Sequence, residues 1–175
     1  MKDWKPEQLN KEQVRAMASD YGIPAIVAML LSIRGVDTYE EVQRFLYDND
    51  DLDDPFLMID MDKATDRIFK ALEDNENICV YGDYDADGVT STALLYDYLS
   101  SLGAKVSYYI PSREAEGYGM NNGAVDKIAE KGITLIITVD NGVSAAEQIE
   151  YAKTLGIDTV VTDHHTPPEK LPDAV

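Results

Sequence analysis

Short apolar runs alternate with longer helical segments between residues 76 and 165. The runs are continuous and rich in β-branched residues, as in parallel strands that are buried on both faces. A glycine follows each helical segment, which is the usual stop at a helix C-terminus. Strand–helix–strand order of this kind predicts an α/β fold with a doubly wound, mainly parallel sheet. The expected strands cover 78–81, 105–110, 134–139 and 158–162, and the expected helices cover 89–102, 122–131 and 144–155.

The first 75 residues have the pattern of a helical region instead. Thr38 is placed to cap one of its helices, with Glu41 three residues further on, which is the spacing of a capping box. We expect residues 1–75 to form a helical N-terminal region that packs on a second domain, residues 76–175. The expected helices of this region cover 7–19, 24–33, 39–47 and 60–74.

The segment 48–55 joins two of these helices and carries five aspartates in seven residues. A calcium-binding loop is one interpretation of such a run. No glutamate or glycine stands at the spacing that calcium ligation needs, so a solvated linker is the better interpretation.

Acidic residues outnumber basic residues by 33 to 15, which gives a formal net charge of −18. A protein that holds nucleic acid through phosphate neutralisation alone should be basic. The charge therefore excludes electrostatic coating of DNA or RNA by this segment. Two interpretations remain: the excess acid holds metal and solvates the surface, or nucleic acid is not the substrate.

The single cysteine, Cys79, lies in an apolar run, which favours a small buried hydrophobe over a reactive thiol. One cysteine cannot form an internal disulfide, which fits a reducing compartment. The N-terminus lacks a charged start followed by an apolar run. The longest apolar stretch, 23–33, is too short to span a bilayer. We expect a cytoplasmic protein with no membrane partner.

Carboxylates and imidazoles follow three of the four expected strands. Asp83, Asp85 and Asp87 follow the first, Asp140 follows the third, and Asp-His-His at 163–165 follows the fourth. Because the carboxyl ends of parallel strands meet at one edge of a sheet, we expect these side chains to form one site. A carboxylate-rich site with one imidazole ligand suits Mn²⁺ or Mg²⁺ better than Zn²⁺. One bridging carboxylate with separate ligands on each side would make a two-metal site.

The first of these motifs also resembles part of a calcium-binding EF-hand loop. With Asp83 as position 1, Gly88 stands at position 6 as required, but position 12 is Leu94, where a glutamate is needed. A strand also precedes the motif, where an EF-hand needs a helix. We therefore expect a strand-end turn, with Gly88 allowing a sharp turn into the next helix. Thr90 and Ser91 are then expected near the helix N-terminus, where free N–H groups favour phosphate.

The other two motifs have plain structural interpretations when each is taken alone. Asp140-Asn141-Gly142 is a common turn sequence, and Ser144 is placed to cap the helix after it. The plain interpretation of the histidine pair, His164 and His165, is an exposed pair in a proline-rich loop. Their shared position at the ends of strands favours a site over both interpretations.

Together these motifs resemble the DHH phosphoesterase family, which is named for the Asp-His-His tripeptide. The resemblance rests on Gly-Asp-Tyr-Asp-Ala-Asp-Gly-Val-Thr-Ser-Thr at 82–92, Ile-Thr-Val-Asp-Asn-Gly at 137–142 and Thr-Asp-His-His at 162–165. Two further stretches, 54–57 and 110–113 with 116–119, match a subgroup of single-strand-specific DNA exonucleases within it. The resemblance covers nearly the whole chain.

The resemblance implies a metal-binding role for five residues. Asp85 is expected to bind a first metal ion and Asp87 a second, with Asp140 as the bridge between them. His164 is expected to bind the second ion, and Asp83 to lie near the first.

Further roles are implied around these ligands. His165 is expected to be catalytic and to face the scissile phosphate, with Asp163 as the acceptor that orients the imidazoles. Tyr81 stands where many members have a histidine, which leaves the first ion without an imidazole. Arg113 is expected to bind substrate by adding positive charge at the phosphate. Tyr118 is expected to stack on a base, with an ordinary loop tyrosine as the alternative.

The implied activity is metal-dependent hydrolysis of phosphodiesters, by a 5′→3′ exonuclease that acts on single-stranded DNA in repair and recombination. The implied cofactors are two Mn²⁺ or Mg²⁺ ions, and a helicase or single-strand-binding protein is an expected partner. A fourth family motif, with a further aspartate ligand, is expected beyond residue 175. The chain is therefore expected to be the N-terminal part of a longer enzyme, with weak or no turnover alone. Two alternatives stay open: a family member that cleaves short oligonucleotides, cyclic dinucleotides or pyrophosphate, and a non-catalytic metal- or partner-binding module.

Overall fold

The computed structural model describes residues 9–47 and 52–175 of the chain. Contacts divide the chain into two compact units, Met1–Asp54 and Pro55–Val175. The start of the helix expected at 7–19 lies outside the described residues, as does the part of the aspartate-rich linker at 48–51.

The first unit contains helices α1 (Lys11–Tyr21), α2 (Ala25–Ile33) and α3 (Tyr39–Tyr47). The capping box of α3 is confirmed: the Thr38 N–H donates to Glu41 Oε2 at 3.0 Å, and the Glu41 N–H donates to Thr38 Oγ1 at 3.3 Å. No single helix in 9–47 or 52–175 is long and apolar enough to cross a membrane. Only when α1 and α2 are counted together, as a pair bent by 120°, do they reach that length and composition. This unit has a small core of its own, formed by Val14, Met17, Ile23, Ala28, Leu31 and Val42.

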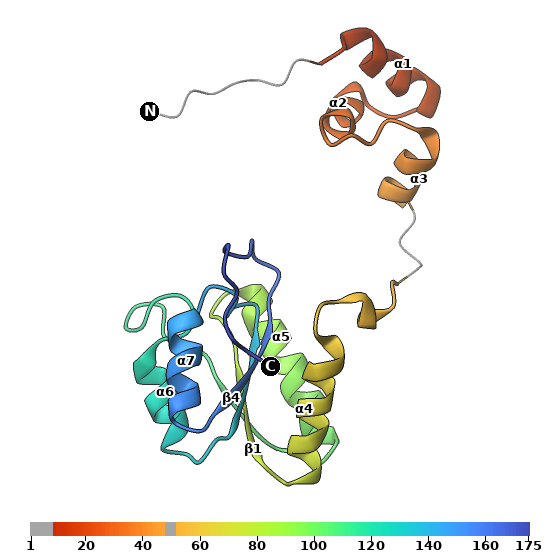
Figure 1. The fold of residues 1–175 in the computed structure, drawn as a ribbon. Coiled ribbons are helices and arrows are strands. Elements are labelled where there is room, and N and C mark those ends of the chain that lie inside the picture. Colours follow the sequence, from red (N-terminus) through yellow and green to blue (C-terminus); the bar gives the residue numbers. More distant parts are fainter. Residues whose placement is uncertain (1–8, 48–51) are drawn as a thin grey trace. The chain divides into compact units, whose positions relative to one another are not determined.

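The second unit holds a four-stranded sheet with strand order β2-β1-β3-β4, in which every pairing is parallel. Figure 1 shows this sheet with helices on both sides. The predicted α/β fold with a doubly wound parallel sheet is confirmed. In chain order the elements are η1 (Pro55–Leu57), α4 (Met61–Glu73), β1 (Asn77–Tyr81), α5 (Ala86–Ser101), β2 (Lys105–Tyr109), α6 (Asn122–Ala129), β3 (Leu135–Val139), α7 (Ala146–Thr154) and β4 (Asp158–Thr162).

Each face of the sheet packs against its own pair of helices. Ile78, Val80 and Ile137 lie in a core with residues of α4 and α5, whereas Cys79 and Ile136 lie in a core with residues of α6 and α7. Alternate side chains of a strand point to opposite faces, which explains why the apolar runs are continuous. Cys79 is 2% exposed, and burial raises the pKa of its thiol to about 11, which confirms that it is a buried hydrophobe.

Helix α4 belongs to the sheet rather than to the helical region that precedes it. Its residue Ala71 is fully buried in the core with β1 and β3. Its Arg67 donates to Glu76 at 2.8 Å and to Asp158 at 2.7 Å, which ties α4 to the residue before β1 and to the start of β4. The division by contacts therefore falls at Asp54–Pro55, not near residue 75 as predicted. The packing of the region before it on the second unit stays a prediction.

Strands β1 and β3 lie side by side at the centre of the sheet, with Ile78 opposite Leu135. From β1 the chain crosses to β2 on one side, and it later returns to β3 on the other side. The carboxyl ends of two such strands form the topological switch point of an open sheet, where the loops diverge and leave a crevice. The loops after β1 and β3 start at Gly82 and Asp140. Both expected aspartate motifs therefore lie at this crevice.

Candidate metal centre

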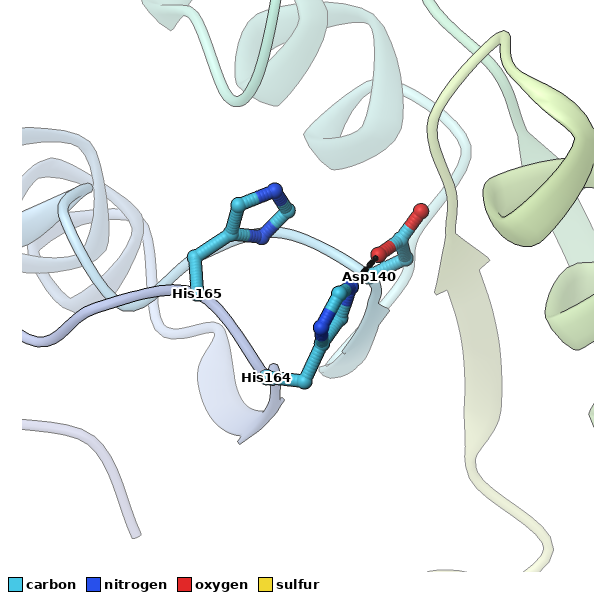
Figure 2. Close-up of side chains that lie close together, drawn as sticks. All are labelled: Asp140, His164 and His165. Atoms are coloured by element: carbon cyan, nitrogen blue, oxygen red, sulfur yellow. Dashed lines mark hydrogen bonds and ion pairs between the residues drawn. The ribbon is translucent and has the colours of Figure 1, made fainter. Parts of the chain in front are cut away.

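Five of the predicted site residues gather at the switch point and form two overlapping groups. Ligand atoms of Asp83, Asp85 and Asp140 lie within 4.8 Å of one another, and so do those of Asp140, His164 and His165. Figure 2 shows both imidazoles beside Asp140, with His164 hydrogen-bonded to its carboxylate. Because Asp140 belongs to both groups, the geometry has the form of a bridging carboxylate between two sets of ligands.

Asp83 is the most buried acid of the centre, with 1% of its surface exposed. Its Oδ1 atom is buried and has no hydrogen-bond partner among residues 9–47 and 52–175. Burial raises the pKa of this carboxyl, and the nearby carboxylates of Asp85 and Asp140 raise it further. A buried carboxylate oxygen without a partner is costly. A divalent cation would satisfy it, so this oxygen and the all-carboxylate donor set around it fit Mn²⁺ or Mg²⁺.

Asp85 lies at the N-cap of α5, where its Oδ1 accepts the Gly88 N–H at 3.0 Å. That N–H is the main cause that lowers the pKa of Asp85. A carboxylate has two oxygens, so Asp85 caps the helix and still offers an oxygen to a cation. The fold thus fixes one metal-capable oxygen through ordinary helix capping.

Gly88 is required by the centre for a reason other than the expected sharp turn. It lies inside the first turn of α5, and its φ is not positive. A Cβ atom here would stand 2.5 Å from the backbone oxygen of Asp83 and 2.7 Å from its Cα. Glycine therefore lets α5 pack directly on the backbone of Asp83, which holds that carboxylate in the crevice.

Asp140 has a φ of 61°, a conformation that costs a non-glycine residue about 1 kcal/mol or more. The adjacent Asn141 stabilises this turn because its fully buried side-chain amide donates to Tyr81 O at 3.2 Å and to Val139 O at 2.9 Å. These two carbonyls end β1 and β3. Asn141 thus ties together the two strands that carry the carboxylates. The sequence suggested only a turn residue here.

His164 and His165 hold different positions at the centre. His164 Nε2 lies 2.8 Å from Asp140 Oδ1, and its ring is largely exposed. His165 Nδ1 lies 2.7 Å from Asp163 Oδ1. This contact is the main cause that raises the pKa of His165. His165 is therefore biased toward the protonated form and can donate from its other nitrogen.

Asp163 has a nearly fully buried side chain and holds the loop after β4 in place. Burial acts to raise its pKa, but hydrogen bonds from the Val143 N–H and from His165 outweigh this and lower it. Val143 N–H donates to Asp163 Oδ2 at 3.0 Å, which joins the loops after β3 and β4. The expected orienting contact is present for His165. No such contact joins Asp163 to His164 among the residues that the structure describes.

Tyr118 reaches the centre from the loop between β2 and α6. Its hydroxyl lies 3.3 Å from the ring nitrogens of His165 and 3.4 Å from Asp140 O. Burial and the surrounding carboxylates raise the pKa of Tyr118 to about 12, so it stays a neutral donor. Tyr81 is fully buried, and its hydroxyl donates to Gly119 O at 3.1 Å. The residue that replaces the expected histidine therefore anchors the loop that carries Tyr118.

Three other expected residues differ from the sequence analysis in position. Helix α5 starts at Ala86, three residues earlier than expected, so Thr90 and Ser91 lie beyond its first turn. Their hydroxyls donate to carbonyls of the same helix, including Asp87 O. Asp85 takes the N-cap position, and the role of Thr90 and Ser91 in binding substrate stays a prediction. Ser144 is not the cap of α7 either: Ala145 holds the N-cap without a side-chain bond.

Asp87 and Arg113 lie at the margins of the centre. Asp87 belongs to neither ligand group, but it lines a shallow pocket with Asp140 and His164. Arg113 lies on the loop before α6, with its guanidinium 5.3 Å from the ring centroid of Tyr84. A cation stacked on an aromatic face is partly ordered, so the positive charge is held at one place.

Comparisons with known proteins agree with this geometry. The family model described as DHH family, N-terminal domain, matches residues 77–175. The chain is 46% identical over 171 residues to the single-stranded-DNA-specific exonuclease RecJ of Bacillus subtilis (strain 168). The matched region covers 97% of the chain and 22% of that protein. The chain thus spans about a fifth of the length of this relative.

Two solved structures resemble the chain as well. A crystal structure of exonuclease RecJ bound to manganese is 39% identical, with a TM-score of 0.61, and covers 64% of the chain and 29% of its own. A crystal structure of RecJ from Thermus thermophilus in complex with Mn²⁺ is 28% identical, with a TM-score of 0.64, and covers 95% of the chain and 23% of its own. The likeness therefore extends to proteins that bind a divalent metal ion.

Proposed function

This chain belongs to the DHH family, and from that premise we propose that it carries part of the active centre of a metal-dependent 5′→3′ exonuclease for single-stranded DNA. The observation that carries the proposal is the pair of ligand groups that share Asp140 at the switch point of the sheet. The relatives named as single-stranded-DNA-specific exonucleases support the choice of substrate.

The proposed ligands follow from the geometry of the two groups. Asp83 and Asp85 form one group with Asp140, and His164 belongs to the other group, on what we propose is the second side of the bridge. Asp87 would join the second side, because it lines the same shallow pocket as His164. When bound there, Mn²⁺ or Mg²⁺ would supply Lewis-acid stabilisation of negative charge on phosphate oxygens and a more acidic bound water.

The chain's own groups would orient the phosphodiester beside these ligands. His165 is biased toward its protonated form by Asp163, so it would donate a hydrogen bond to a phosphate oxygen. Arg113 would add a second positive charge from the loop before α6. The neutral Tyr118 hydroxyl would hold the His165 ring in place. Donors that are already oriented need no rearrangement during the reaction, which lowers its barrier.

The net charge of −18 bears on how a polyanion would bind. Phosphate contacts from this chain alone would be few, because acids outnumber basic residues by 33 to 15. The chain covers only 22% of the Bacillus subtilis relative, so we propose that much of the DNA contact lies in regions that this chain does not match. Weak or absent turnover by the chain alone follows from this proposal.

The setting of this activity is also part of the proposal. We propose that the enzyme acts in the cytoplasm, together with a helicase or single-strand-binding protein that supplies single strands. A buried, unpaired Cys79 fits a reducing compartment. Affinity purification under native conditions that recovered neither kind of partner would argue against this part.

The test combines metal binding with cleavage. The chain would be mixed with Mn²⁺ and 5′-phosphorylated single strands of increasing length, with a matched duplex as control. We expect two bound Mn²⁺ ions by calorimetry and slow release of mononucleotides from the 5′ end of the single strand. Cleavage confined to di- and trinucleotides would favour a family member that acts on short oligonucleotides. Unchanged Mn²⁺ binding in an Asp140→Ala variant would exclude the proposed bridge.

A further inference from the structure

A small cavity adjoins the metal centre on the side of α7. It has a volume of about 230 Å³. Pockets for drug-sized ligands are usually roughly 300–1,000 Å³, so this cavity suits one small group rather than a complete nucleotide. Its lining comprises Tyr118, Gly119, Met120, Gly142, Val143, Ser144, Ala145, Gln148, Asp163 and His165.

The walls of the cavity consist mostly of apolar side chains, an aromatic ring and exposed backbone. Tyr118 contributes an aromatic ring, Met120 contributes a thioether with 7% of its surface exposed, and Gly142 leaves backbone uncovered. Gln148, whose side chain carries a carboxamide, lines the cavity from α7. No other described residue hydrogen-bonds the Gln148 side chain, so its donor and acceptor are both free for a ligand.

The cavity and the metal centre share residues. Asp163 and His165 line the cavity, and His165 also belongs to the ligand group with Asp140. The rings of Tyr118 and His165 meet edge to face with centroids 5.8 Å apart, at the boundary between the two spaces. A nucleotide whose phosphate lies at the metal centre would therefore have its base within reach of the cavity.

We propose that this cavity is a nucleobase subsite, with Tyr118 as the stacking wall and Gln148 as the hydrogen-bond partner. The inference deepens the proposed function and rests on it. A phosphate is a poor occupant of the cavity, because Asp163 adds a negative charge to the lining and His165, the one basic side chain in it, is the group that the proposed function directs at the phosphate of the metal centre. A neutral, planar heteroaromatic ring matches an aromatic wall and a thioether.

The chemistry of Gln148 also predicts how the subsite discriminates. A carboxamide both donates and accepts, so it can bond an edge of any base. Stacking on Tyr118 is available to every base as well. The subsite would therefore require a base without selecting among bases, as a nuclease without sequence preference needs.

The test compares a Gln148→Ala variant on two substrates. One is an ordinary 5′-phosphorylated single strand, and the other carries an abasic residue at its 5′-terminal nucleotide. We expect Gln148→Ala to lower kcat/KM about tenfold on the ordinary strand, and to leave cleavage of the abasic strand unchanged. Glu150→Ala is the matched control, because Glu150 is exposed on the same helix and does not line the cavity. Equal losses on both strands, or no loss on either, would overturn the subsite.

A binding measurement separates this inference from the proposed function. Saturation-transfer NMR would follow thymidine 5′-phosphate and deoxyribose 5-phosphate with the chain and Mg²⁺. We expect transfer to the base protons that is weaker in Gln148→Ala, while transfer to the sugar persists. That result would support the subsite even if the chain hydrolyses nothing. Absence of transfer to the base protons with the unsubstituted chain would overturn it, whether or not hydrolysis is seen.

Discussion

Two aspartates at the metal centre have a conformation or an environment that lowers the stability of the fold. Asp83 is buried with an unpartnered oxygen, and Asp140 has a positive φ. Strain and unpaired polar groups of this kind persist where the surrounding structure enforces them, and they cluster at functional sites. Here Gly88 and Asn141 enforce them, through close backbone packing and through two amide hydrogen bonds.

The bridging role of Asp140 gives a prediction at this scale. Asp140→Asn keeps a residue type that tolerates positive φ but removes the charge shared by both ligand groups. Loss of an outer partner of a metal ligand typically costs roughly 10- to 100-fold in affinity, so loss of a bridging ligand should cost at least about tenfold. Calorimetric titration with Mn²⁺ measures this. Asp97→Asn, exposed on α5 away from the centre, should leave the affinity unchanged.

The residue scale also shows what sequence can and cannot reveal about the centre. Carboxylates that follow apolar strands are recognisable, because a parallel sheet brings strand ends together. The role of Asn141 is not recognisable from the sequence, because it depends on the ends of two strands that lie far apart in sequence. The pairing of Tyr81 with Gly119 was hidden for the same reason. Contacts across the sheet carry no signal in local spacing.

At the scale of single elements, helix α5 starts at Ala86, with Asp85 as its N-cap, rather than at Val89. The apolar pattern of the sequence starts at Val89 and misses the first turn of the helix, which carries Asp87 and the exposed Ala86. Acidic residues in the first turn stabilise a helix, because their negative charge interacts with the positive end of the helix dipole. The metal-facing turn is therefore regular helix, and Thr90 and Ser91 lie further along the helix than a start at Val89 would place them.

A pair of glycines tests the packing of this first turn. Gly88→Ala would place a Cβ 2.5 Å from the backbone of Asp83, so we expect a loss of about 1–3 kcal/mol in unfolding free energy and weaker Mn²⁺ binding. Gly123, in the first turn of α6, has no atom closer than 3.5 Å to such a Cβ. Gly123→Ala should therefore stabilise the protein by up to about 1 kcal/mol. Urea unfolding measures both, and equal signs for the two variants would refute this account of Gly88.

The loop between β2 and α6 is fastened by a network around Glu116. Its carboxylate accepts from Tyr109 at 2.5 Å, from Lys127 at 2.7 Å and from the Ser112 N–H at 2.9 Å. These contacts, led by Lys127, lower the pKa of Glu116 to about 2. Tyr109 in turn stacks on Tyr81 with centroids 5.3 Å apart. The loop that carries Arg113 and Tyr118 is thus held to the sheet.

The depressed pKa gives this network a defined pH dependence. A carboxyl with a lowered folded pKa adds stability that is present above its ordinary pKa of 4.5 and is lost as the pH falls toward about 2. Glu116→Gln should therefore lower the melting temperature at pH 7, and the difference from the unsubstituted chain should shrink as the pH falls below the ordinary pKa. Thermal unfolding across the range from neutral pH down to the lowered pKa measures this. A difference that stays constant with pH would show that the charge of Glu116 does not matter.

At the scale of the whole molecule, the chain combines two units that bury separate cores. Residues of α1, α2 and α3 form one core, and the sheet with its flanking helices forms two more. Every residue of the metal centre belongs to the second unit, Pro55–Val175. The family match at 77–175 also lies within this unit. Metal binding should therefore be linked to the stability of one unit and not of both.

This linkage can be followed by hydrogen exchange with and without Mn²⁺. A ligand at about 100 times its dissociation constant stabilises the folded state by about 2.7 kcal/mol, because it binds the native state alone. We expect slower exchange in β1, β3 and β4 and in the loops that follow them, where the carboxylates and imidazoles meet. Helices α1 to α3 should exchange at unchanged rates, because their core contains none of these residues. The Asp140→Asn variant is the control, in which the same concentration of Mn²⁺ should slow exchange in the second unit less than in the unsubstituted chain. Equal protection of α1 to α3 in the unsubstituted chain would mean that the two units fold as one cooperative system.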